Sequence, residues 1–425
     1  MRAISKPAWA WALYDWANSA FALSVLVVFY GPFFTRYWFD GPAEQGLSWV
    51  AVSVTVSSLA VAALAPILGA IVEAGRLKKK CLLGLAGVGM LSTAALAAVP
   101  QGAWELALLL RLVASLGFFG SLVCYDALLT GVTTRQNRHL VSGLGFSLGF
   151  LGSMLLLIGQ FIVVQKPELL GLDGTHAVKL AFVTVALWWL LFTLPLWRWV
   201  EEGQAESPAS LRQAVGHTWR ELAQTLRFLR HTPAAGLFLL AYFIYIDGAN
   251  TLTNMTTTYA EAVGIPSQDL LLAIILVQIV GVPCALLLGF LGQKISPRKL
   301  ITFCILVYLG VAICSFRLSA APMQAFGLPV SQIYLLAGLI GMVQGGLQAL
   351  SRSHLANVVP EQHISGCFGF YNMLGKGGAI FGPLMMGGIG LVSGDTRWGT
   401  LAMAALFIAG LALLWRTPQP AITRA

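Results

Sequence analysis

Twelve segments of about 20 apolar residues, nearly free of charge, constrain the fold of this chain more than any other feature of its sequence. A helix of about 20 apolar residues crosses the hydrocarbon core of a bilayer, whereas soluble core helices have shorter apolar stretches. We therefore expect an all-α integral membrane protein with twelve transmembrane helices. The segments are 8–34, 48–73, 81–99, 104–128, 140–164, 178–199, 234–259, 268–292, 299–318, 329–352, 365–392 and 397–416.

The charged residues support this interpretation by their number and their positions. Only 10% of the 425 residues are charged, against about a quarter in a soluble domain. Most of the 26 Lys and Arg residues fall in loops on one predicted side of the membrane, and the other side holds only Arg36, Lys166, Lys179, Arg317 and Arg397. The positive-inside rule makes the basic side cytoplasmic. We expect a multi-pass protein of the bacterial cytoplasmic (inner) membrane with both termini cytoplasmic. Orientation accounts for the net charge of +9, so no nucleic acid is expected as a partner.

The sequence shows none of the residue patterns that are typical of metal sites, phosphate-binding loops or enzyme active sites. The six cysteines form no Cys-x-x-Cys pair, and the six histidines form no ligand cluster, which argues against a metal site. No phosphate-binding loop is present, since the Gly375-Lys376 pair is followed by glycine. No pairing of a nucleophile with a base is visible in the loops. We therefore expect neither an enzyme nor a cofactor.

Related patterns in the two halves indicate an internal duplication. Asp15 precedes Asn18 by three residues in the first segment, and Asp247 precedes Asn250 in the same way in the seventh, so each pair shares a helix face. Similar basic loops follow the second and eighth segments. The fifth opens with His139-Leu140-Val141-Ser142-Gly143 and the eleventh with the similar His363-Ile364-Ser365-Gly366. Parallel six-helix repeats are typical of secondary transporters. The predicted domains are residues 1–199, a linker at 200–232, and residues 233–425.

The linker carries a predicted amphipathic helix. Ser207-Pro208 is typical of a helix start, and Arg residues alternate with an apolar stripe. The helix lies either in the inner headgroup region or against the helix bundle, because periodicity does not distinguish these two partners. The apolar stripe consists of Leu211, Val215, Trp219, Leu222, Leu226 and Leu229.

Four motifs and the two basic loops carry a resemblance to a known family. The motifs are residues 14–21, 245–251, 344–353 and 368–372. The loops resemble the signature loop of the major facilitator superfamily, with Glu73 as the acid of the first copy and Gln293 in the comparable region of the second. The motifs are similar to those of the unknown-major-facilitator family, which is related to the yeast autophagy-related protein 22, a vacuolar amino-acid effluxer. The resemblance covers nearly the whole chain.

The resemblance implies the major facilitator fold and transport by alternating access, with the first, fourth, seventh and tenth spans lining a central cavity. We expect a monomeric secondary transporter of a small polar or zwitterionic solute, with amino acids as the leading class and efflux as the direction. Proton coupling and uniport both fit, since Asp15 and Asp247 are titratable groups within spans. Membrane lipids are the other expected partners. A lipid, amphiphile or drug exporter is one alternative, and a non-transporting scaffold or receptor is another.

Charges inside the spans are the first candidates for the substrate or proton site, because each is costly in a bilayer. Asp247 and Lys376 are expected to share the cavity and to act in transport, the alternative being a salt bridge that only locks the bundle. Asp15, which lies nearer the cytoplasmic side, is a candidate proton carrier, gate residue or backbone cap. Arg111 either binds an anionic group of the substrate or extends to the outer headgroups.

Uncharged polar groups and basic loops complete the prediction. Hydrogen bonds to the solute, or between helices, are expected from Asn18, Asn250, Gln344, Gln348, Tyr371 and Asn372. Contacts between loop charges and helix ends would hold the inner side shut, although these charges also set the topology. The predicted gate residues are Glu73, Arg76, Lys78, Arg298 and Arg352.

Overall fold

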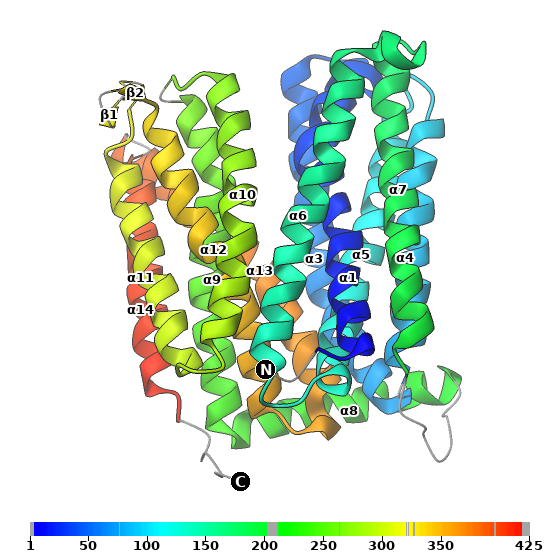
Figure 1. Ribbon diagram of the computed structural model, residues 1–425, viewed down its shortest axis with the longest axis vertical. Helices are drawn as coiled ribbons and strands as arrows, with labels where there is room; N and C mark the ends of the chain where they lie inside the picture. The colour runs from blue at the N-terminus through cyan, green and yellow to red at the C-terminus, as the bar shows by residue number, and fades with distance from the viewer. Residues whose placement is uncertain are drawn as a thin grey trace. The chain divides into compact units, whose positions relative to one another are not determined.

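In its described residues the chain forms twelve helical segments, the first of them irregular, with a 21-residue helix in the linker and a small hairpin at Met323–Val330 (Figure 1). The structure is a computed structural model that describes residues 4–418, except 76, 202–210, 263, 320, 322, 326–327 and 395–396. Within these ranges, the side chains of 74, 75, 211–216, 254–259, 261, 262, 267, 325, 328, 329, 376–380, 387, 390 and 391 are not described.

The first half begins with an irregular span. It contains α1 (Lys6–Ala20), the π-helix η1 (Phe21–Phe29), the short α2 (Tyr30–Phe33) and a second π-helical stretch, η2 (Phe34–Trp38). Pro32 lies in this region and has no N–H to donate, which is a common cause of a break in helical hydrogen bonding. The elements that follow are α3 (Ala43–Gly75), α4 (Lys78–Ala95), η3 (Leu96–Ala98), α5 (Trp104–Val132), α6 (Arg138–Gln165), η4 (Pro167–Leu170) and α7 (Gly174–Trp199).

The second half follows the linker helix α8 (Leu211–His231). Its elements are α9 (Pro233–Ala262), α10 (Ser267–Leu291), α11 (Pro297–Phe316), β1 (Met323–Ala325), β2 (Leu328–Val330), α12 (Gln332–Val358), η5 (Glu361–His363), α13 (Ile364–Ser393) and α14 (Arg397–Arg416). Eleven helices of the described part are long and apolar enough to cross a membrane. The remaining predicted span, the eleventh, corresponds to α13, a 30-residue helix whose side chains are only partly described.

The hairpin corrects one boundary of the sequence prediction. The predicted tenth span begins at residue 329, but residues 328–330 pair antiparallel with residues 323–325, and α12 begins at Gln332. The apolar Leu328-Pro329-Val330 run is continuous with the span in sequence, so hydrophobicity alone does not separate them. The fold is therefore helical apart from this short hairpin in the described residues.

The contacts divide the chain into two compact units. Unit 1 comprises residues 1–133, 148–222 and 364–373, and unit 2 comprises residues 134–147, 223–363 and 374–425. Each unit thus includes the start of a helix whose remainder belongs to the other unit: α13 in unit 1 and α6 in unit 2. The predicted domain boundaries at 199 and 233 follow the sequence duplication and stay a prediction.

Helix packing inside the units repeats in detail. In unit 1, α1 packs against α5 and α7, α3 against α5, and α4 against α5 and α7. In unit 2, α9 packs against α12 and α14, α10 against α12, and α11 against α12 and α14. Figure 1 shows α11 and α14 side by side. The same five pairings therefore occur in both, which is the arrangement expected of a duplicated six-helix unit.

Candidate functional site

Asp247, on α9 in unit 2, is a buried carboxylate with an unsatisfied oxygen. It is 2% exposed, and its Oδ1 atom has no hydrogen-bond partner in the described part of the chain. Thr251, one turn further along α9, is 1% exposed, and its hydroxyl also lacks a described partner. Buried polar atoms are nearly always hydrogen-bonded, so two neighbouring exceptions on one helix face make Asp247 and Thr251 a candidate binding site.

A glycine of α13 creates the space beside these two side chains. A Cβ atom at Gly382 would lie 3.2 Å from Asp247 Oδ1 and would overlap the Thr251 hydroxyl. Only glycine therefore permits this approach of α13 to α9. The charge of Asp247 has no ion-pair partner among the described side chains. The predicted partner Lys376 is on α13, but its side chain lies outside the described residues.

The other predicted residues of unit 2 lie on the helices that pack around α9. Asn250 donates a hydrogen bond to the Gly375 carbonyl of α13 at 3.3 Å. Gln344 and Gln348 are half-buried on α12, and Gln344 Oε1 is a further buried acceptor without a described partner. Tyr245, just before Asp247, is joined to Ser351 of α12 by a 2.7 Å hydrogen bond. This tyrosine–serine contact locks α9 to α12 next to the site.

In unit 1, Asp15 lies in different surroundings. It is 6% exposed and accepts a 2.8 Å hydrogen bond from the Tyr125 hydroxyl of α5. The Tyr125 ring stacks on Trp11 of α1 with 4.2 Å between centroids, and the Trp11 indole N–H donates to the Tyr125 carbonyl at 2.8 Å. Tyr14 donates to Ser121 of α5 at 2.9 Å. The Asp15 carboxylate is thus part of a hydrogen-bonded joint between α1 and α5.

Asn18 and its neighbour Ser19 continue this face of α1. The Asn18 side chain is 2% exposed, and its Nδ2 atom has no described partner. A Cβ atom at Gly149 of α6 would lie 2.6 Å from Ser19 Oγ, so α6 also approaches α1 through a glycine. The free donor at Asn18 makes it a candidate to bind a solute acceptor.

Arg111 is the buried cation of unit 1. It is 4% exposed on α5, donates from Nη1 to Ser53 Oγ of α3 at 2.8 Å, and lies 5.1 Å from the centre of the Tyr30 ring. Its Nε atom has no described partner, and no carboxylate pairs with it in the part of the chain that the structure describes. Tyr30 follows the π-helical stretch η1, so the irregular first span presents this ring to the guanidinium. A side chain that extends to the outer headgroups would be exposed at its end, whereas the Arg111 side chain is buried.

Two clasps join helix starts to helix ends. The first, in unit 1, is acidic: Glu73 at the end of α3 accepts hydrogen bonds from the Ser365 and Gly366 amides in the first turn of α13. A carboxylate is favourable there because the first amides of a helix are unpaired and carry partial positive charge. Asn372 adds a 2.9 Å hydrogen bond to Asp126 of α5. Gly69 permits the contact, since a Cβ there would lie 2.5 Å from the Ser365 carbonyl.

The second clasp, in unit 2, is basic. Arg138 at the start of α6 donates to the Ala356 carbonyl at 2.7 Å and to Asn357 Oδ1 at 2.8 Å, both at the C-terminal end of α12. Arg352 of α12 donates from Nε to Ser142 Oγ at 3.0 Å and lies 4.6 Å from the Phe146 ring centre. Helix C-termini carry partial negative charge, so cations are favourable there.

The second clasp also contains residues that the sequence did not single out. His139 contacts Ser353 at 2.7 Å and Asn357 at 3.1 Å. Arg138 was interpreted only as an orientation charge, and the His139–Gly143 stretch only as a repeat marker. The sequence signal that could have found this clasp is the presence of Arg138, His139 and Ser142 together in the first turns of a span, where they form a polar patch on the helix.

The remaining predicted gate residues are placed elsewhere or are not described. Arg298 donates to the Thr417 carbonyl and lies 5.8 Å from the Trp415 ring centre, so it contacts the end of α14. Lys78 is half-buried at the start of α4 and has no ion-pair partner in the described residues. Tyr371 is buried against Phe368 with 5.7 Å between ring centroids. Arg76 lies outside the described residues.

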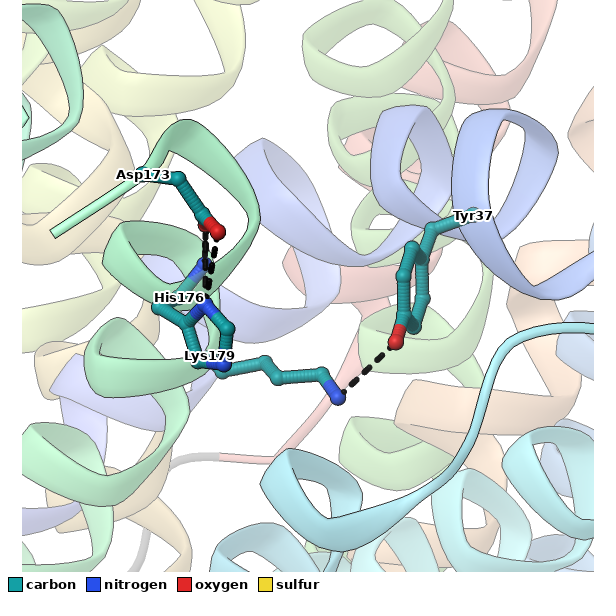
Figure 2. A network of polar contacts seen from close by, with 4 residues as sticks. All are labelled: Tyr37, Asp173, His176 and Lys179. Carbon is teal, nitrogen blue, oxygen red and sulfur yellow. Dashed lines mark hydrogen bonds and ion pairs between the residues drawn. The ribbon is translucent and has the colours of Figure 1, made fainter.

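A polar network that the sequence analysis did not predict surrounds the start of α7 (Figure 2). Asp173 precedes α7 and accepts hydrogen bonds from the His176 amide at 2.7 Å and from the His176 ring at 2.9 Å. These hydrogen bonds, the backbone one first, hold the pKa of the Asp173 carboxyl below its ordinary value of 3.8. Lys179 donates to the Tyr37 hydroxyl at 3.1 Å and lies 4.7 Å from the ring centre. The network fixes the end of η2 to α7.

Comparison with known proteins gives consistent matches. Residues 39–424 match the family model described as vacuole effluxer Atg22 like. The uncharacterized MFS-type transporter YxiO of Bacillus subtilis is 33% identical over 431 residues, which cover 100% of this chain and 97% of the relative. Autophagy-related protein 22-1 of Penicillium rubens is 24% identical over 299 residues, covering 67% of this chain and 49% of the relative. The chain thus spans about half the length of this fungal relative.

A solved structure shows the same fold at low sequence identity. The fucose:proton symporter FucP of E. coli aligns with a TM-score of 0.62 and 14% identity, covering 98% of this chain and 97% of that chain. At this identity the likeness establishes the major facilitator fold alone.

Proposed function

The chain belongs to the vacuole effluxer Atg22-like family of the major facilitator superfamily, and from this premise we propose that it exports small zwitterionic solutes, with amino acids as the leading class. The protein is a multi-pass membrane transporter with the fold of that superfamily. The name of the family, vacuole effluxer Atg22 like, supports export as the direction of transport. The class of solute rests on the buried charges and on the amino-acid effluxer that the sequence motifs resemble.

The observation that carries the proposal is the unsatisfied Asp247–Thr251 pair. The ammonium group of an amino acid has three N–H donors and a positive charge. A buried carboxylate without a described cationic partner gains most from such a group, because burying a charge is costly unless it is paired. Thr251 supplies a second acceptor one turn away. We assign the ammonium group of the solute to these two side chains.

Arg111 supports the same class of solute by its own surroundings. Its guanidinium is buried, keeps one N–H donor free, and has no described carboxylate partner. Arginine has a planar fork that matches a carboxylate. A solute carboxylate would supply the missing counter-charge, so Arg111 is the proposed carboxylate-binding residue of unit 1.

The two clasps are proposed as the inner gate of an alternating-access cycle. Glu73 and Arg138 bind helix ends through charge-assisted hydrogen bonds, which break and re-form without a change in the covalent chain. Export would require both clasps to open when the solute enters from the cytoplasmic side and to close before it leaves. The cytoplasmic position of these ends, and of both termini, rests on the distribution of basic residues.

Proton coupling is the proposed energy source. Asp247 is the carboxyl group that would exchange a proton for the solute ammonium, because both need the same oxygen atoms. FucP is a fucose:proton symporter, which supports only the compatibility of the fold with proton coupling. Uniport remains the alternative, and a pH gradient distinguishes the two.

Transport by the purified protein in proteoliposomes tests the proposal. A thermal-stability screen against amino acids, peptides, sugars and drugs first selects solutes, and efflux of the radiolabelled hit is then measured with and without a pH gradient. Asp247→Asn should abolish efflux, whereas Asp173→Asn, which changes an acid outside the membrane spans, should not. Wild-type efflux by Asp247→Asn would refute the assigned role. Flux of labelled lipid without flux of any amino acid would favour the amphiphile exporter instead.

A further inference from the structure

A pocket beside the linker helix has no role in the proposed transport cycle. It has a volume of about 280 Å³ in unit 2 and lies where the end of α8 meets the residues that precede α9 and α13. Its lining residues are Gln224, Arg227, Phe228, His231, Thr232 and His363.

One face of α8 supplies most of the lining. Residues 224, 227, 228 and 231 are spaced by three and four, so they project from the same side of the helix. Phe228 stacks on His363 of η5 with 4.6 Å between ring centroids, which fixes the pocket wall on the side of α13. The pocket is therefore formed by a contact between two elements rather than by a loose surface loop.

The chemistry of the lining suits an anion. Arg227 supplies a permanent positive charge, and Gln224, Thr232, His231 and His363 supply further hydrogen-bond donors. Thr232 directly precedes α9, and its carbonyl accepts from the Ala235 and Gly236 amides. His363 directly precedes α13. The N-terminus of α9 thus begins at the pocket, and its partial positive charge adds to that of the side chains.

We propose that this pocket binds a phosphate-bearing anion. Four neutral or basic donor side chains around Arg227 match the several acceptor oxygens of a phosphoryl group better than the two of a carboxylate. The occupant would join α8, α9 and the segment that leads into α13. Because Glu73 already holds the first amides of α13, the anion would bind through the side chains of the pocket.

The outer face of α8 indicates an anionic phospholipid as the expected source of the phosphate. Trp219 is 74% exposed and Leu226 is 50% exposed, whereas Thr218 and Thr225 face the protein. Tryptophan and leucine opposite a polar face are typical of helices that lie at a membrane surface. Of the two alternatives that the sequence leaves open, this pattern favours the headgroup region, since Trp219 and Leu226 of the apolar stripe are not covered by protein. A soluble phosphate compound is the other source of the same chemistry.

Lipid binding by the full chain tests the site. The protein is reconstituted in nanodiscs of phosphatidylcholine with or without phosphatidylglycerol, and retained lipid is counted by native mass spectrometry. Arg227→Gln should weaken phosphatidylglycerol retention about 10-fold or more, because it removes a charge-assisted hydrogen bond. Arg220→Gln is the matched control, since it makes the same change at an exposed position of α8 outside the pocket.

A second arm distinguishes the source of the phosphate. Thermal unfolding is measured with inorganic phosphate and with chloride at equal ionic strength. Stabilisation by phosphate that Arg227→Gln removes, without selective lipid retention, would retain the site and assign it to a soluble compound. Equal losses in Arg227→Gln and Arg220→Gln, or no response to either probe, would overturn the proposal. His363→Asn gives an independent check, because asparagine preserves the helix start while removing the imidazole.

Discussion

Asp15 in unit 1 and Asp247 in unit 2 share a motif but have different neighbours. Each is buried near the middle of the first helix of its half and precedes an asparagine by three residues. Asp15 accepts a hydrogen bond from Tyr125, whereas one oxygen of Asp247 has no described donor. The same short pattern therefore serves a structural joint in one unit and leaves an unsatisfied carboxylate in the other.

A shift of one residue explains this difference. Tyr14 and Tyr245 form equivalent hydrogen bonds, to Ser121 of α5 and to Ser351 of α12. Asp15 comes directly after its tyrosine, but Asp247 comes two residues after, and each residue turns the helix by about 100°. Asp15 consequently points toward α5, and Asp247 points toward Gly382 of α13. Position around the helix, and not the motif, decides the role of each acid.

The largest effect is expected from neutralising the two acids in parallel. Asp247→Asn should lower transport by about 100-fold or more, because losing one partner of a buried charged contact costs about 2–5 kcal/mol. Asp15→Asn should lower it much less, since its contacts join α1 to α5. Efflux from proteoliposomes measures both. Equal losses in the two variants would show that the difference in surroundings has no functional meaning.

Removing one tyrosine hydroxyl group from each unit should lower the free energy of unfolding. Tyr125→Phe should destabilise the protein by about 1–3 kcal/mol, because it removes a donor from the buried Asp15 carboxylate. Tyr245→Phe breaks a bond between two neutral hydroxyls and should cost about 0.5–1.5 kcal/mol. Unfolding in detergent measures both changes. A double variant with Asp15→Asn should recover part of the loss, and full additivity would contradict the Tyr125–Asp15 contact.

The two units can also be compared at their helix ends, where unit 1 has the Glu73 clasp and unit 2 has the Arg138 clasp. Glu73→Gln and Arg138→Gln should each weaken one clasp by about 0.3–1 kcal/mol, the range for a charge at a helix terminus. Hydrogen exchange should rise at the Ser365 and Gly366 amides in the first variant only. The second variant should instead loosen the end of α12. Faster exchange at both places in both variants would mean that the clasps do not act separately.

The smallest effect concerns the cap of α7 at Asp173. Its hydrogen bonds with His176 lower the pKa of the carboxyl in the folded state, so the carboxylate stabilises the helix start above the ordinary pKa of 3.8. This contribution is present at neutral pH and is lost as the pH falls through the lowered folded pKa. Asp173→Asn should therefore raise exchange at the start of α7 at pH near 7 but not under strong acid. We expect no change in transport from Asp173→Asn, because the contacts in Figure 2 involve only the start of α7 and the end of η2.

The sequence predicted much of the fold because membrane spans follow from length and hydrophobicity alone. The hairpin at Met323–Val330 escaped because its second strand is as apolar as the helix that follows. The π-helical part of the first span was also missed, although Pro32 marks a break in the donor pattern. Backbone irregularity inside a uniformly apolar run does not alter the hydropathy that identifies the run.

The candidate site was predicted less completely, for a physical reason. Buried charges such as Asp247 and Arg111 are recognisable in sequence because a charge within a span is costly. Their partners are not recognisable, since Thr251, Tyr125 and Ser53 are common residue types in spans. The second clasp was missed for the opposite reason: Arg138 lies at a helix start, where a basic residue already has an explanation in membrane orientation.

By itself, the sequence determined that this chain is a duplicated helical membrane protein with an aspartate, Asp15 or Asp247, in the first span of each half. Composition, segment length and motif spacing suffice for this, because they are properties of the chain alone. Only the tertiary structure decided which acid is satisfied and which is not, and which charges hold helix ends. The reason is that a hydrogen bond depends on the direction of a side chain around its helix and on the neighbour that packs there, and a shift of one residue changes both.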